Sequence, residues 1–248
     1  MKVSIITVCY NSVETLKKTI DSVHSQTYFN IEYIIIDGGS TDGTIQLIIE
    51  NDNLITRWIS EPDKGLYDAM NKGIKLASGD IVGILNSDDI FYSNSVIEKI
   101  VAFHIDNNIQ ASIGDVVQCK THGKVRRFYS ARKWSPFKLI YGLMPPHPSI
   151  FFRRELHEAL GYYSNEFKIG ADYELITRYF LKNGITWKYS GITTTSMLVG
   201  GVSSSGFSSY FVISKEIQKA LRMNNIRFSK FRIYARILWK IFDFKFNA

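Results

Sequence analysis

Two stretches, VSIITVCYNS at residues 3–12 and IEYIIIDGGSTDGT at residues 31–44, decide the fold of this chain. Each is a run of mostly β-branched, apolar residues that ends in polar, turn-forming residues, as expected of a buried parallel strand. Between the two runs, Asn11 and Ser12 offer caps for a helix, and apolar residues recur at helical spacing at Val13, Leu16, Ile20 and Val23. Strand, helix and strand in this order predict a β-α-β unit with parallel strands.

The same alternation continues to about residue 105. Helices are expected near residues 44–50, 64–76 and 93–103, and strands at 54–60 and 81–85. Strands separated by helices predict an α/β fold with a Rossmann-like, mostly parallel central sheet flanked by helices. Ligands of such sheets bind beyond the carboxyl ends of the strands. The polar residues that follow the strands are therefore the first candidates for function.

The pattern changes after residue 105. Residues 111–118 and 124–129 predict a hairpin that turns at Thr121-His122-Gly123, and the prolines of Pro145-Pro146-His147-Pro148 exclude a helix there. A helix is expected near residues 171–183. This second half is therefore predicted to be a smaller, mixed structure.

We expect one domain at residues 1–205 and a C-terminal helical segment at residues 206–248. Residues 1–105 and residues 106–205 would form the two halves of this domain. The Gly- and Ser-rich residues 200–206 suit either a lid over a bound ligand or a flexible linker.

The composition is that of an ordinary globular protein. Among 248 residues, 45% are hydrophobic and 21% are charged, which excludes a disordered or collagen-like chain. Two cysteines, Cys9 and Cys119, are too few for a disulfide framework, so a reducing compartment is expected. There is no secretion signal and no run of the roughly 18 to 20 apolar residues that a membrane span requires. These features predict a soluble, cytoplasmic protein.

The basic residues are concentrated at the C-terminus. Nine of the 30 Lys and Arg residues, but only two of the 23 Asp and Glu residues, follow position 214, so residues 1–214 carry equal numbers of both. Residues 228–240 read FSKFRIYARILWK, in which aromatic and basic residues alternate. This pattern suits a helix in an anionic membrane interface, an ordinary helix docked on the domain, or a segment that binds single-stranded nucleic acid.

Polar or acidic residues close three of the expected strands: Tyr10-Asn11, Asp37 and Asp88-Asp89. Adjacent aspartates at the end of a buried strand repel each other unless a cation lies beside them. Mg²⁺ and Mn²⁺ suit such a pair, because they bind through one or two carboxylates together with phosphate oxygens and water. Alternatively, the pair caps the helix expected at 93–103.

Three common nucleotide-binding and hydrolase motifs are absent. The sequence has no Gly-x-Gly-x-x-Gly after the first strand, no Gly-x-x-x-x-Gly-Lys-Ser/Thr loop and no Gly-x-Ser-x-Gly elbow. These absences argue against a dinucleotide-dependent enzyme, a P-loop enzyme and an α/β-hydrolase.

Six segments together resemble the family 2 glycosyltransferases, which have the GT-A fold. The likeness extends over about residues 1–205 and is carried by residues 3–11, 36–44, 61–73, 85–89, 145–149 and 169–175. Residues 61–73, EPDKGLYDAMNKG, also resemble the subgroup that builds bacterial polysaccharides such as lipopolysaccharide O-antigen.

This resemblance implies that residues 1–105 form a nucleotide-sugar-binding half and residues 106–205 an acceptor-binding half, and it implies a role for individual residues. Asp37 would accept a hydrogen bond from the uracil imide, Asp88 would meet the ribose or the donor sugar, and Asp89 would bind a divalent metal ion, Mn²⁺ or Mg²⁺, on the diphosphate. The Asp-x-Asp of many relatives is Ser87-Asp88-Asp89 here, which leaves Asp89 as the one expected direct metal ligand. The whole set implied for nucleotide-sugar binding is Thr7, Val8, Tyr10, Glu14, Asp37, Asp63, Asn71, Lys72 and Asp88.

The chemistry implied is a direct displacement. The metal would stabilise the departing diphosphate, so no general acid is needed, and Asp172 would take the proton of the attacking hydroxyl group with inversion at the anomeric carbon. Asp172 alternatively caps the helix that follows it. His147 would lie on the acceptor side, although a histidine between prolines also suits a purely structural role.

The resemblance implies an enzyme that transfers a hexose or N-acetylhexosamine from a UDP-sugar to a lipid-linked saccharide of the undecaprenyl-diphosphate type. Such an enzyme would assemble surface polysaccharide at the inner face of the cytoplasmic membrane, held there peripherally by the C-terminal segment, and would need no nucleic acid. A nucleotidyltransferase and a non-catalytic nucleotide-sugar or nucleic-acid binding protein are the alternatives. The sequence indicates neither the sugar and acceptor nor the oligomeric state.

Overall fold

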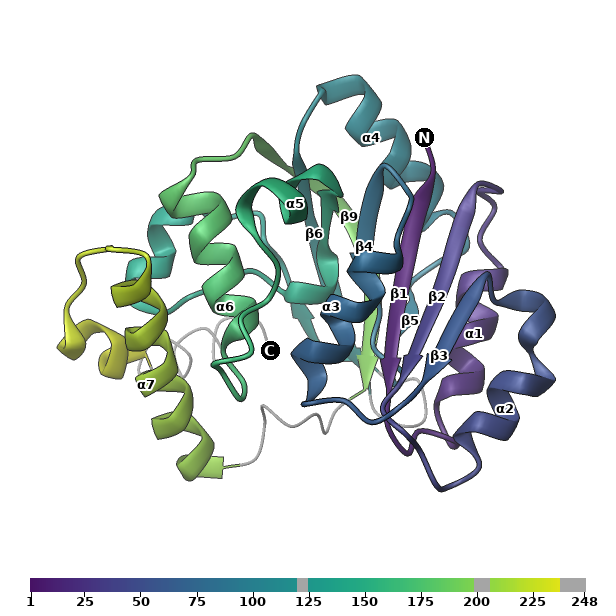
Figure 1. The fold of residues 1–248 in the computed structure, drawn as a ribbon. Coiled ribbons are helices and arrows are strands. Elements are labelled where there is room, and N and C mark those ends of the chain that lie inside the picture. Colours follow the sequence, from purple (N-terminus) through teal and green to yellow (C-terminus); the bar gives the residue numbers. More distant parts are fainter. Residues whose placement is uncertain (120–124, 199–205, 237–248) are drawn as a thin grey trace.

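The computed structural model of the chain describes residues 1–119, 125–198 and 206–236 (Figure 1). Its centre is a nine-stranded sheet in the order β3-β2-β1-β4-β8-β6-β9-β5, with β7 paired to β6. The strands are β1 (Val3–Cys9), β2 (Ile31–Asp37), β3 (Arg57–Ser60), β4 (Ile81–Ile84), β5 (Ile90–Phe91), β6 (Ala111–Cys119), β7 (Val125–Tyr129), β8 (Ile150–Arg153) and β9 (Trp187–Leu198).

The first four strands form the parallel sheet that the sequence predicts. β1 pairs in parallel with both β2 and β4, and β2 pairs in parallel with β3. Every residue of β1 is buried, as its continuous apolar pattern requires. Cys9 lies opposite Asp37 in the register, so the carboxyl ends of β1 and β2 are level with each other.

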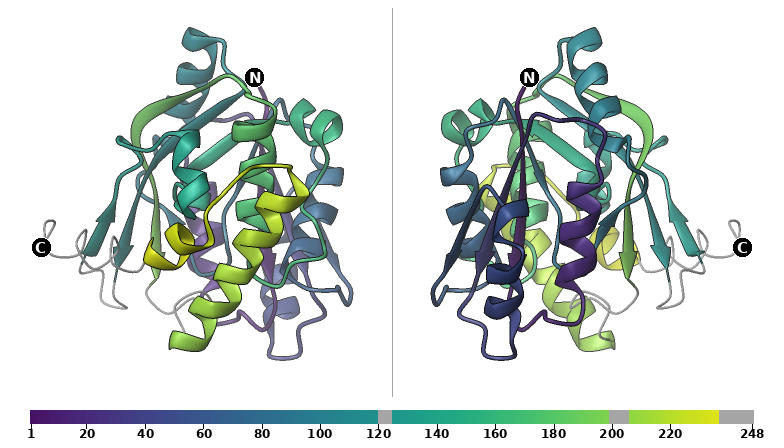
Figure 2. Two further views of the ribbon diagram at one scale, coloured as in Figure 1. Left: turned by 90° about the vertical axis from the view of Figure 1, so that its left-hand side faces the viewer. Right: turned by 90° about the vertical axis from the view of Figure 1, so that its right-hand side faces the viewer.

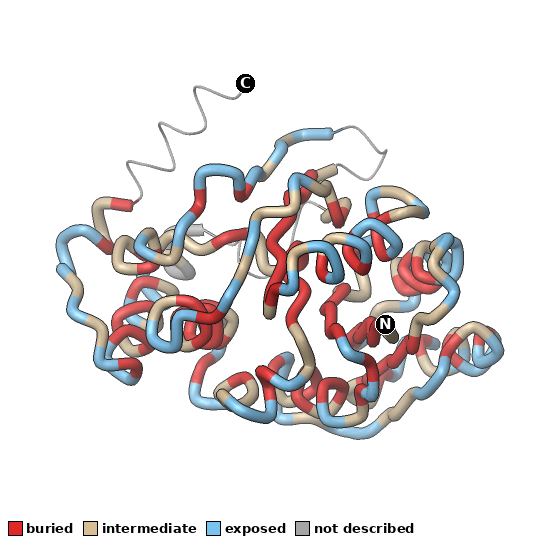
Figure 3. Tube along the Cα trace, turned by 90° about the horizontal axis from the view of Figure 1, so that it is seen from above, coloured by how far each residue is buried: buried red, intermediate tan, exposed pale blue. Residues whose placement is uncertain are grey.

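Helices cover both faces of this sheet. Because side chains alternate along a strand, Ile5 faces one hydrophobic cluster and Ile6 the other. α1 (Leu16–His24), α2 (Thr44–Glu50) and α4 (Val96–Asn107) pack on the Ile5 face, whereas α3 (Leu66–Leu76), α5 (Glu155–Leu160), α6 (Ala171–Ile176) and α7 (Gly206–Met223) pack on the Ile6 face. Figure 2 shows the two layers from either side, and Figure 3 shows the buried residues concentrated along the central strands and the helix faces toward them.

The second half of the sheet is mixed. β8 is antiparallel to β4 on one side and to β6 on the other, while β6 and β9 are parallel and β9 and β5 antiparallel. The predicted hairpin is confirmed as the antiparallel pair β6–β7, and its turn at 121–123 lies outside the described residues. The expectation that 145–148 excludes a helix needs one correction, because His147–Ser149 forms a single 3₁₀ turn. A proline is tolerated there, since the first turn of a helix needs no backbone N–H from it.

Close packing of α3 on β1 depends on Gly73. A Cβ atom at this position would lie 2.4 Å from Ile6 Cγ2.

Near the amino ends of β1 and β2, the buried carboxylate of Glu32 accepts hydrogen bonds from Ser4 Oγ, Ser78 N and Lys2 Nζ at 2.5, 2.7 and 2.9 Å. Burial opposes ionisation of Glu32, but these bonds outweigh it and lower its pKa to about 2.

α7 packs against α6 and shares the domain's hydrophobic core (Figure 2, left). Ile217, Ala220 and Leu221 of α7 are buried in the same cluster as α3 and α6, and so is Ile233 in the helical turn at 230–236. The C-terminal segment is therefore docked on the domain as far as residue 236. Apart from Gly206, the predicted loop 200–206 lies outside the described residues. No helix in the described ranges is long and apolar enough to cross a membrane.

Candidate active site

Asp37 is buried at the end of β2 and organises the turn that follows. Its Oδ2 accepts hydrogen bonds from Gly39 N at 3.1 Å, Ser40 N at 3.0 Å and Ser60 Oγ at 2.7 Å, and Ser40 Oγ donates to Oδ1. Burial disfavours the charged form, but these donors outweigh it and hold the pKa of Asp37 below its usual value. Asp37 is therefore an ionised carboxylate that is already bound by its own loop. Its predicted contact with the uracil imide stays a prediction.

Asp63 brings a second carboxylate to the same strand end. Its Oδ1 accepts a hydrogen bond from Gly65 N at 2.8 Å. Its Oδ2 lies where a side chain at position 38 would begin, because a Cβ atom on Gly38 would be only 2.6 Å from it. The same Cβ atom would lie 3.5 Å from the ring of Tyr10, whose side chain is 64% exposed. Gly38 thus makes room for a half-buried carboxylate beside an exposed aromatic ring.

The Asp88-Asp89 pair follows β4, as predicted. Asp88 is half-buried, whereas Asp89 is 2% exposed and accepts one side-chain hydrogen bond, from Asn86 Nδ2 at 3.1 Å. Burial, and then the negative charge of Asp88, raise the pKa of Asp89 to about 8. β5 separates this pair from α4, whose N-cap is Ser95, so neither aspartate caps that helix.

These two carboxylates fit a divalent cation. The half-buried Asp88 lies next to the buried Asp89, whose donors, Asn86 Nδ2 and the Leu198 backbone N–H, are neutral, and a cation would compensate the negative charge of the pair. Within the described ranges no group of three or more His, Cys, Asp and Glu residues is arranged to hold a metal ion. The residues therefore fit a metal that takes one or two protein ligands and completes its shell with substrate oxygens and water.

Asp172 lies in the first turn of α6, in the second half of the chain. Its Oδ1 accepts a hydrogen bond from the N–H of its neighbour Tyr173 at 2.7 Å and lies 3.5 Å from the hydroxyl group of Tyr67. Burial raises the pKa of Asp172 to about 6, against the opposing effect of these two donors. The N-cap of α6 is Gly170, and Asp172 does not bond the N–H groups two or three residues on that a cap would satisfy. A carboxylate of this pKa is ionised at neutral pH and accepts a proton readily.

Tyr67 joins the two halves of the site. It lies in the first turn of α3, only four residues after Asp63, and its hydroxyl group donates to Ile169 O. Its ring stacks on Tyr163 with centroids 5.7 Å apart, and the Tyr163 hydroxyl group is 2.6 Å from His147 Nε2. The carboxyl ends of β1 and β2 and the loop before α6 lie at the same lower edge in Figure 1.

His147 contacts Tyr163, the ring on which Tyr67 stacks. Burial lowers its pKa to about 4, so the ring is neutral at physiological pH and bonds to Tyr163. A neutral ring bonded to a neighbouring tyrosine fits a purely structural role of His147. Contact with an acceptor stays a prediction.

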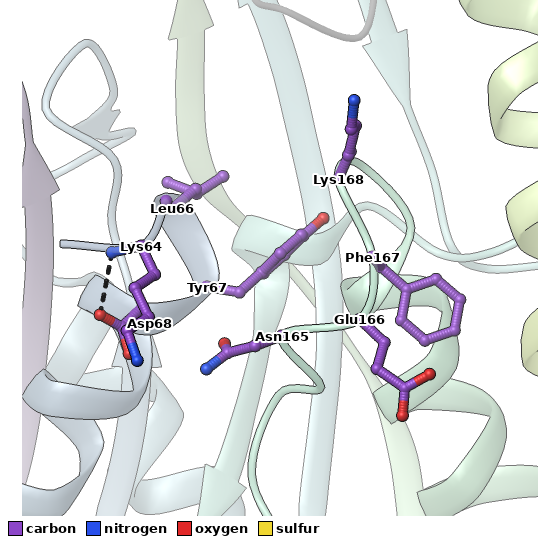
Figure 4. Close-up of a pocket in the computed structure, with 9 residues that line it drawn as sticks. Lys64, Leu66, Tyr67, Asp68, Asn165, Glu166, Phe167 and Lys168 are labelled. Carbon is purple, nitrogen blue, oxygen red and sulfur yellow. Dashed lines mark hydrogen bonds between the residues drawn. The ribbon is translucent and has the colours of Figure 1, made fainter.

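A cavity of about 390 Å³ lies beside Tyr67, between the first turn of α3 and the loop before α6 (Figure 4). In the close-up, Tyr67 stands between the α3 residues on one side and the loop residues on the other. The cavity is lined by Lys64, Gly65, Leu66, Tyr67, Asp68, Asn165, Glu166, Phe167 and Lys168. It is bounded by charged residues of both signs and adjoins the candidate base through Tyr67.

The other predicted donor-site residues differ in how they are placed. Thr7 and Val8 are buried within β1, where Thr7 Oγ1 accepts a hydrogen bond from Tyr33. Glu14 is exposed in the turn before α1. Asn71 uses both ends of its amide on the backbone of Tyr163, at 2.8 and 2.9 Å, and Lys72 Nζ is 2.8 Å from a Glu61 carboxylate oxygen. Their roles in nucleotide-sugar binding stay predictions.

Sequence reasoning did not single out Gly38, Tyr67 or Tyr163. Tyr67 follows Asp63 and Gly65 in the quoted 61–73 segment, so its motif carried a signal. The partners of Tyr67 lie about one hundred residues away along the chain, so no local sequence pattern predicts them.

Comparisons with known proteins agree on one family. A family model described as Glycosyl transferase family 2 matches residues 4–161. The chain is 35% identical over 187 residues to an uncharacterized glycosyltransferase of Mycobacterium tuberculosis, covering 71% of this chain and 68% of that protein. It is 30% identical over 226 residues to a PGL/p-HBAD biosynthesis glycosyltransferase of Mycobacterium bovis, covering 89% and 84%.

Solved structures confirm the predicted GT-A architecture. S. aureus TarS, crystallised as a fragment in complex with UDP-GlcNAc, superposes with a TM-score of 0.71 at 20% identity, over 96% of this chain and 72% of that one. The mannosyltransferase PcManGT from Pyrobaculum calidifontis, in complex with GDP-Man and Mn²⁺, gives 0.66 at 19% identity, over 95% and 68%.

Proposed function

The chain belongs to glycosyltransferase family 2, and we propose that it transfers a hexose or an N-acetylhexosamine from a UDP-sugar to a lipid-linked saccharide, with inversion at the anomeric carbon. Membership makes it a glycosyltransferase that uses a nucleotide sugar, and it sets aside the nucleotidyltransferase alternative. The observation that carries the finer proposal is the contact made by Tyr67, in the helix that follows Asp63. Its hydroxyl group donates to Ile169 O in the loop before α6 and lies 3.5 Å from the half-buried carboxylate of Asp172.

Donor binding is assigned to the carboxyl ends of the parallel strands. Tyr10 offers an exposed ring on which a nucleobase stacks. The imide N–H was expected at Asp37, but because that carboxylate is already bound by its own turn, we assign the imide to Asp63 Oδ2 beside Tyr10. Asp37 shapes this surface by fixing the 38–40 turn. Uracil carries an imide N–H and guanine a lactam N–H, either of which a carboxylate can accept, and the structurally similar TarS and PcManGT were solved with UDP-GlcNAc and GDP-Man respectively. A donor screen therefore includes both nucleotides.

The metal is assigned to Asp89, with Asp88 beside it. A divalent cation held there supplies positive charge to the departing diphosphate. The mannosyltransferase relative with Mn²⁺ bound supports the choice of Mn²⁺ or Mg²⁺. Asp88 is left to bind the ribose or the sugar hydroxyl groups from its half-buried position.

Proton removal is assigned to Asp172. The Tyr173 N–H and the Tyr67 hydroxyl group both contact Oδ1, which leaves Oδ2 to the acceptor hydroxyl group. A base on the acceptor side, opposite the departing diphosphate, accepts the proton in a single displacement, and a single displacement inverts the anomeric centre.

The acceptor is assigned to the cavity beside Tyr67. Lys64 and Lys168 both line it, and their ammonium groups suit the diphosphate of a lipid-linked saccharide. Surface-polysaccharide assembly is proposed on the resemblance of residues 61–73. One relative is named instead for PGL/p-HBAD biosynthesis, so the pathway needs an experiment.

Membrane contact is assigned to an aromatic–basic surface formed by Phe137, Tyr141, Phe211, Phe231 and Arg232. The three phenylalanines are 60%, 55% and 80% exposed, in that order along the chain. The Arg232 guanidinium lies 5.4 Å from the Tyr141 ring centroid, which joins the segment at 230–236 to the 3₁₀ helix Pro136–Tyr141. Exposed aromatic rings beside cations suit an anionic lipid interface.

The proposal is tested with purified protein, Mn²⁺ or Mg²⁺ and a panel of UDP-glucose, UDP-galactose, their N-acetyl forms and GDP-mannose, with a synthetic diphosphate-lipid acceptor. We expect one UDP-sugar to be consumed, EDTA to stop the reaction, and Asp89→Ala to lower the rate at least a hundredfold. Asp106→Ala, a change at an exposed aspartate of α4, is the matched control. Consumption of GDP-mannose alone, or full activity of Asp89→Ala, would contradict the donor or the metal assignment.

A further inference from the structure

The carboxylate of Glu216, in α7, binds three successive backbone N–H groups in the loop before α6. Lys168 N donates to Oε1 at 2.8 Å, and Ile169 N and Gly170 N donate to Oε2 at 3.0 and 2.8 Å. A carboxylate that accepts several N–H groups forms charge-assisted bonds, which are stronger than neutral ones. The loop thereby loses the freedom to turn its amide groups elsewhere.

The close approach of Glu216 depends on the glycine at position 170. A Cβ atom there would lie 3.1 Å from both Glu216 Cβ and Oε2. Gly170 has a φ of −104°, which other residues adopt as well, so the space for Glu216 is the reason for glycine at this position. Helix, loop and glycine therefore fit one another as a unit.

The same loop is held from its other side by the donor-side half. The Tyr67 hydroxyl group donates to Ile169 O, so residue 169 is bonded through its N–H to α7 and through its carbonyl to α3. Asp172 follows only three residues later, and its Oδ1 is 3.5 Å from the same hydroxyl group. Any shift of the 168–170 segment therefore moves Asp172.

α7 is anchored well enough to serve as the fixed side. Ile217 and Leu221 follow Glu216 by one and five residues, and they are 2% and 0% exposed in the domain core. Lys219 adds a second contact with the loop, because its Nζ donates to Glu166 O at 3.0 Å and lies 4.7 Å from the Phe167 ring centroid.

We propose that Glu216 is a positioning residue for Asp172, so that this one side chain of α7 helps to hold the candidate base in place. This inference rests on the proposed function in that it takes Asp172 as the base. Glu216 itself does not touch the reacting atoms. It fixes the loop and lends its negative charge to the surroundings of Asp172, which favours the protonated form of that base.

The test compares Glu216→Gln and Gly170→Ala with Lys215→Ala, an exposed neighbour on the same helix. Glutamine keeps the shape but presents one acceptor oxygen instead of two and turns an N–H₂ group toward donors. We expect kcat to fall roughly ten- to a hundredfold in Glu216→Gln and Gly170→Ala, because a displacement of about 1 Å at a reacting group costs up to about a hundredfold. The Kd for UDP and the behaviour of Lys215→Ala stay at wild-type values.

Two readouts separate positioning from mere stability. In Glu216→Gln, which removes a negative charge near Asp172, the acidic limb of the kcat–pH profile moves to lower pH. Hydrogen exchange at amides 168–170 becomes faster, and this measurement needs no substrate. Wild-type kcat, pH profile and amide protection in Glu216→Gln and Gly170→Ala would overturn the inference. If the wild-type protein transfers no sugar, the proposed function fails, while faster exchange at 168–170 still upholds the anchoring of the loop by Glu216.

Discussion

Replacing the candidate base with its neutral isostere, Asp172→Asn, should make the protein more stable and nearly inactive. Burial raises the pKa of Asp172 from 3.8 to about 6, so the folded protein disfavours the ionised form that the unfolded chain carries at neutral pH. A difference of that size corresponds to at most about 3 kcal/mol above pH 6. Asparagine has no ionised form, so the variant escapes this cost.

The sign of the effect sets a pH window. Both states of the wild-type protein are protonated at position 172 below about pH 4, so the stability advantage of Asp172→Asn shrinks toward zero between about pH 6 and pH 4. Activity changes in the opposite sense, because the base works only when it is deprotonated. We expect wild-type kcat to fall as the pH drops through about 6, and kcat of Asp172→Asn to be lower by roughly 10² to 10⁴ at pH 7.

Urea unfolding of both proteins between pH 4 and pH 8 measures the stability difference, and UDP-sugar turnover over the same range measures the activity. Isothermal titration with UDP is the control, because donor binding should not change. A stability difference that is absent at pH 7, or that stays constant down to pH 4, would refute the assignment of a buried, destabilised carboxylate. Unchanged kcat in a folded variant would refute its role as the base.

Three further outcomes are expected. Gly38→Ala places a Cβ atom 2.6 Å from Asp63 Oδ2, so it should weaken UDP binding about tenfold. The double variant Gly38→Ala/Asp63→Ala should bind UDP no more weakly than Asp63→Ala alone when both are titrated with UDP. Glu32→Gln should lower the unfolding free energy by about 2 to 3 kcal/mol at pH 7, because the pKa of Glu32 is about 2 in the folded protein and 4.5 in an ordinary setting. In denaturant titrations this difference should disappear as the pH falls from about 4.5 to about 2. Gly73→Ala should destabilise the protein by about 1 to 3 kcal/mol in thermal unfolding, because its Cβ atom would meet Ile6 Cγ2 at 2.4 Å. The better helix propensity of alanine acts in the opposite direction, so a more stable Gly73→Ala protein would contradict the close packing of α3 on β1.

The sequence predicts what is local in this fold. β1 and β2 follow from continuous apolar runs, and α2 was expected at residues 44–50 and spans Thr44–Glu50. Placement of Asp37 and Asp89 at strand ends follows from the same reasoning, since a polar residue after a buried parallel strand has one edge of the sheet to occupy. Short strands such as β5 and β8 escape prediction, because two to four residues carry no periodicity.

The remaining parts of the site depend on contacts between distant segments. Charge and aromatic content made the C-terminal segment look separable, yet Glu216 bonds to the loop at 168–170, and Tyr67 reaches Asp172 across 105 residues. Composition along the chain reports which residues are basic or apolar, but the partner of a single carboxylate is decided by tertiary packing. For the same reason the test of membrane binding should use substitutions at Phe231 and Phe137 in place of a deletion of residues 215–248, which would remove Ile217 and Leu221 from the core.

The position of β8 limits how this enzyme can move. β8 bonds along one edge to β4 of the first half of the chain and along the other edge to β6 of the second half. The two halves therefore share one continuous sheet, and a hinge that opened between them would break the β4–β8 ladder. We therefore expect substrate entry and nucleotide release to rely on movement of connecting loops at the rim of the sheet, while the sheet itself keeps its shape.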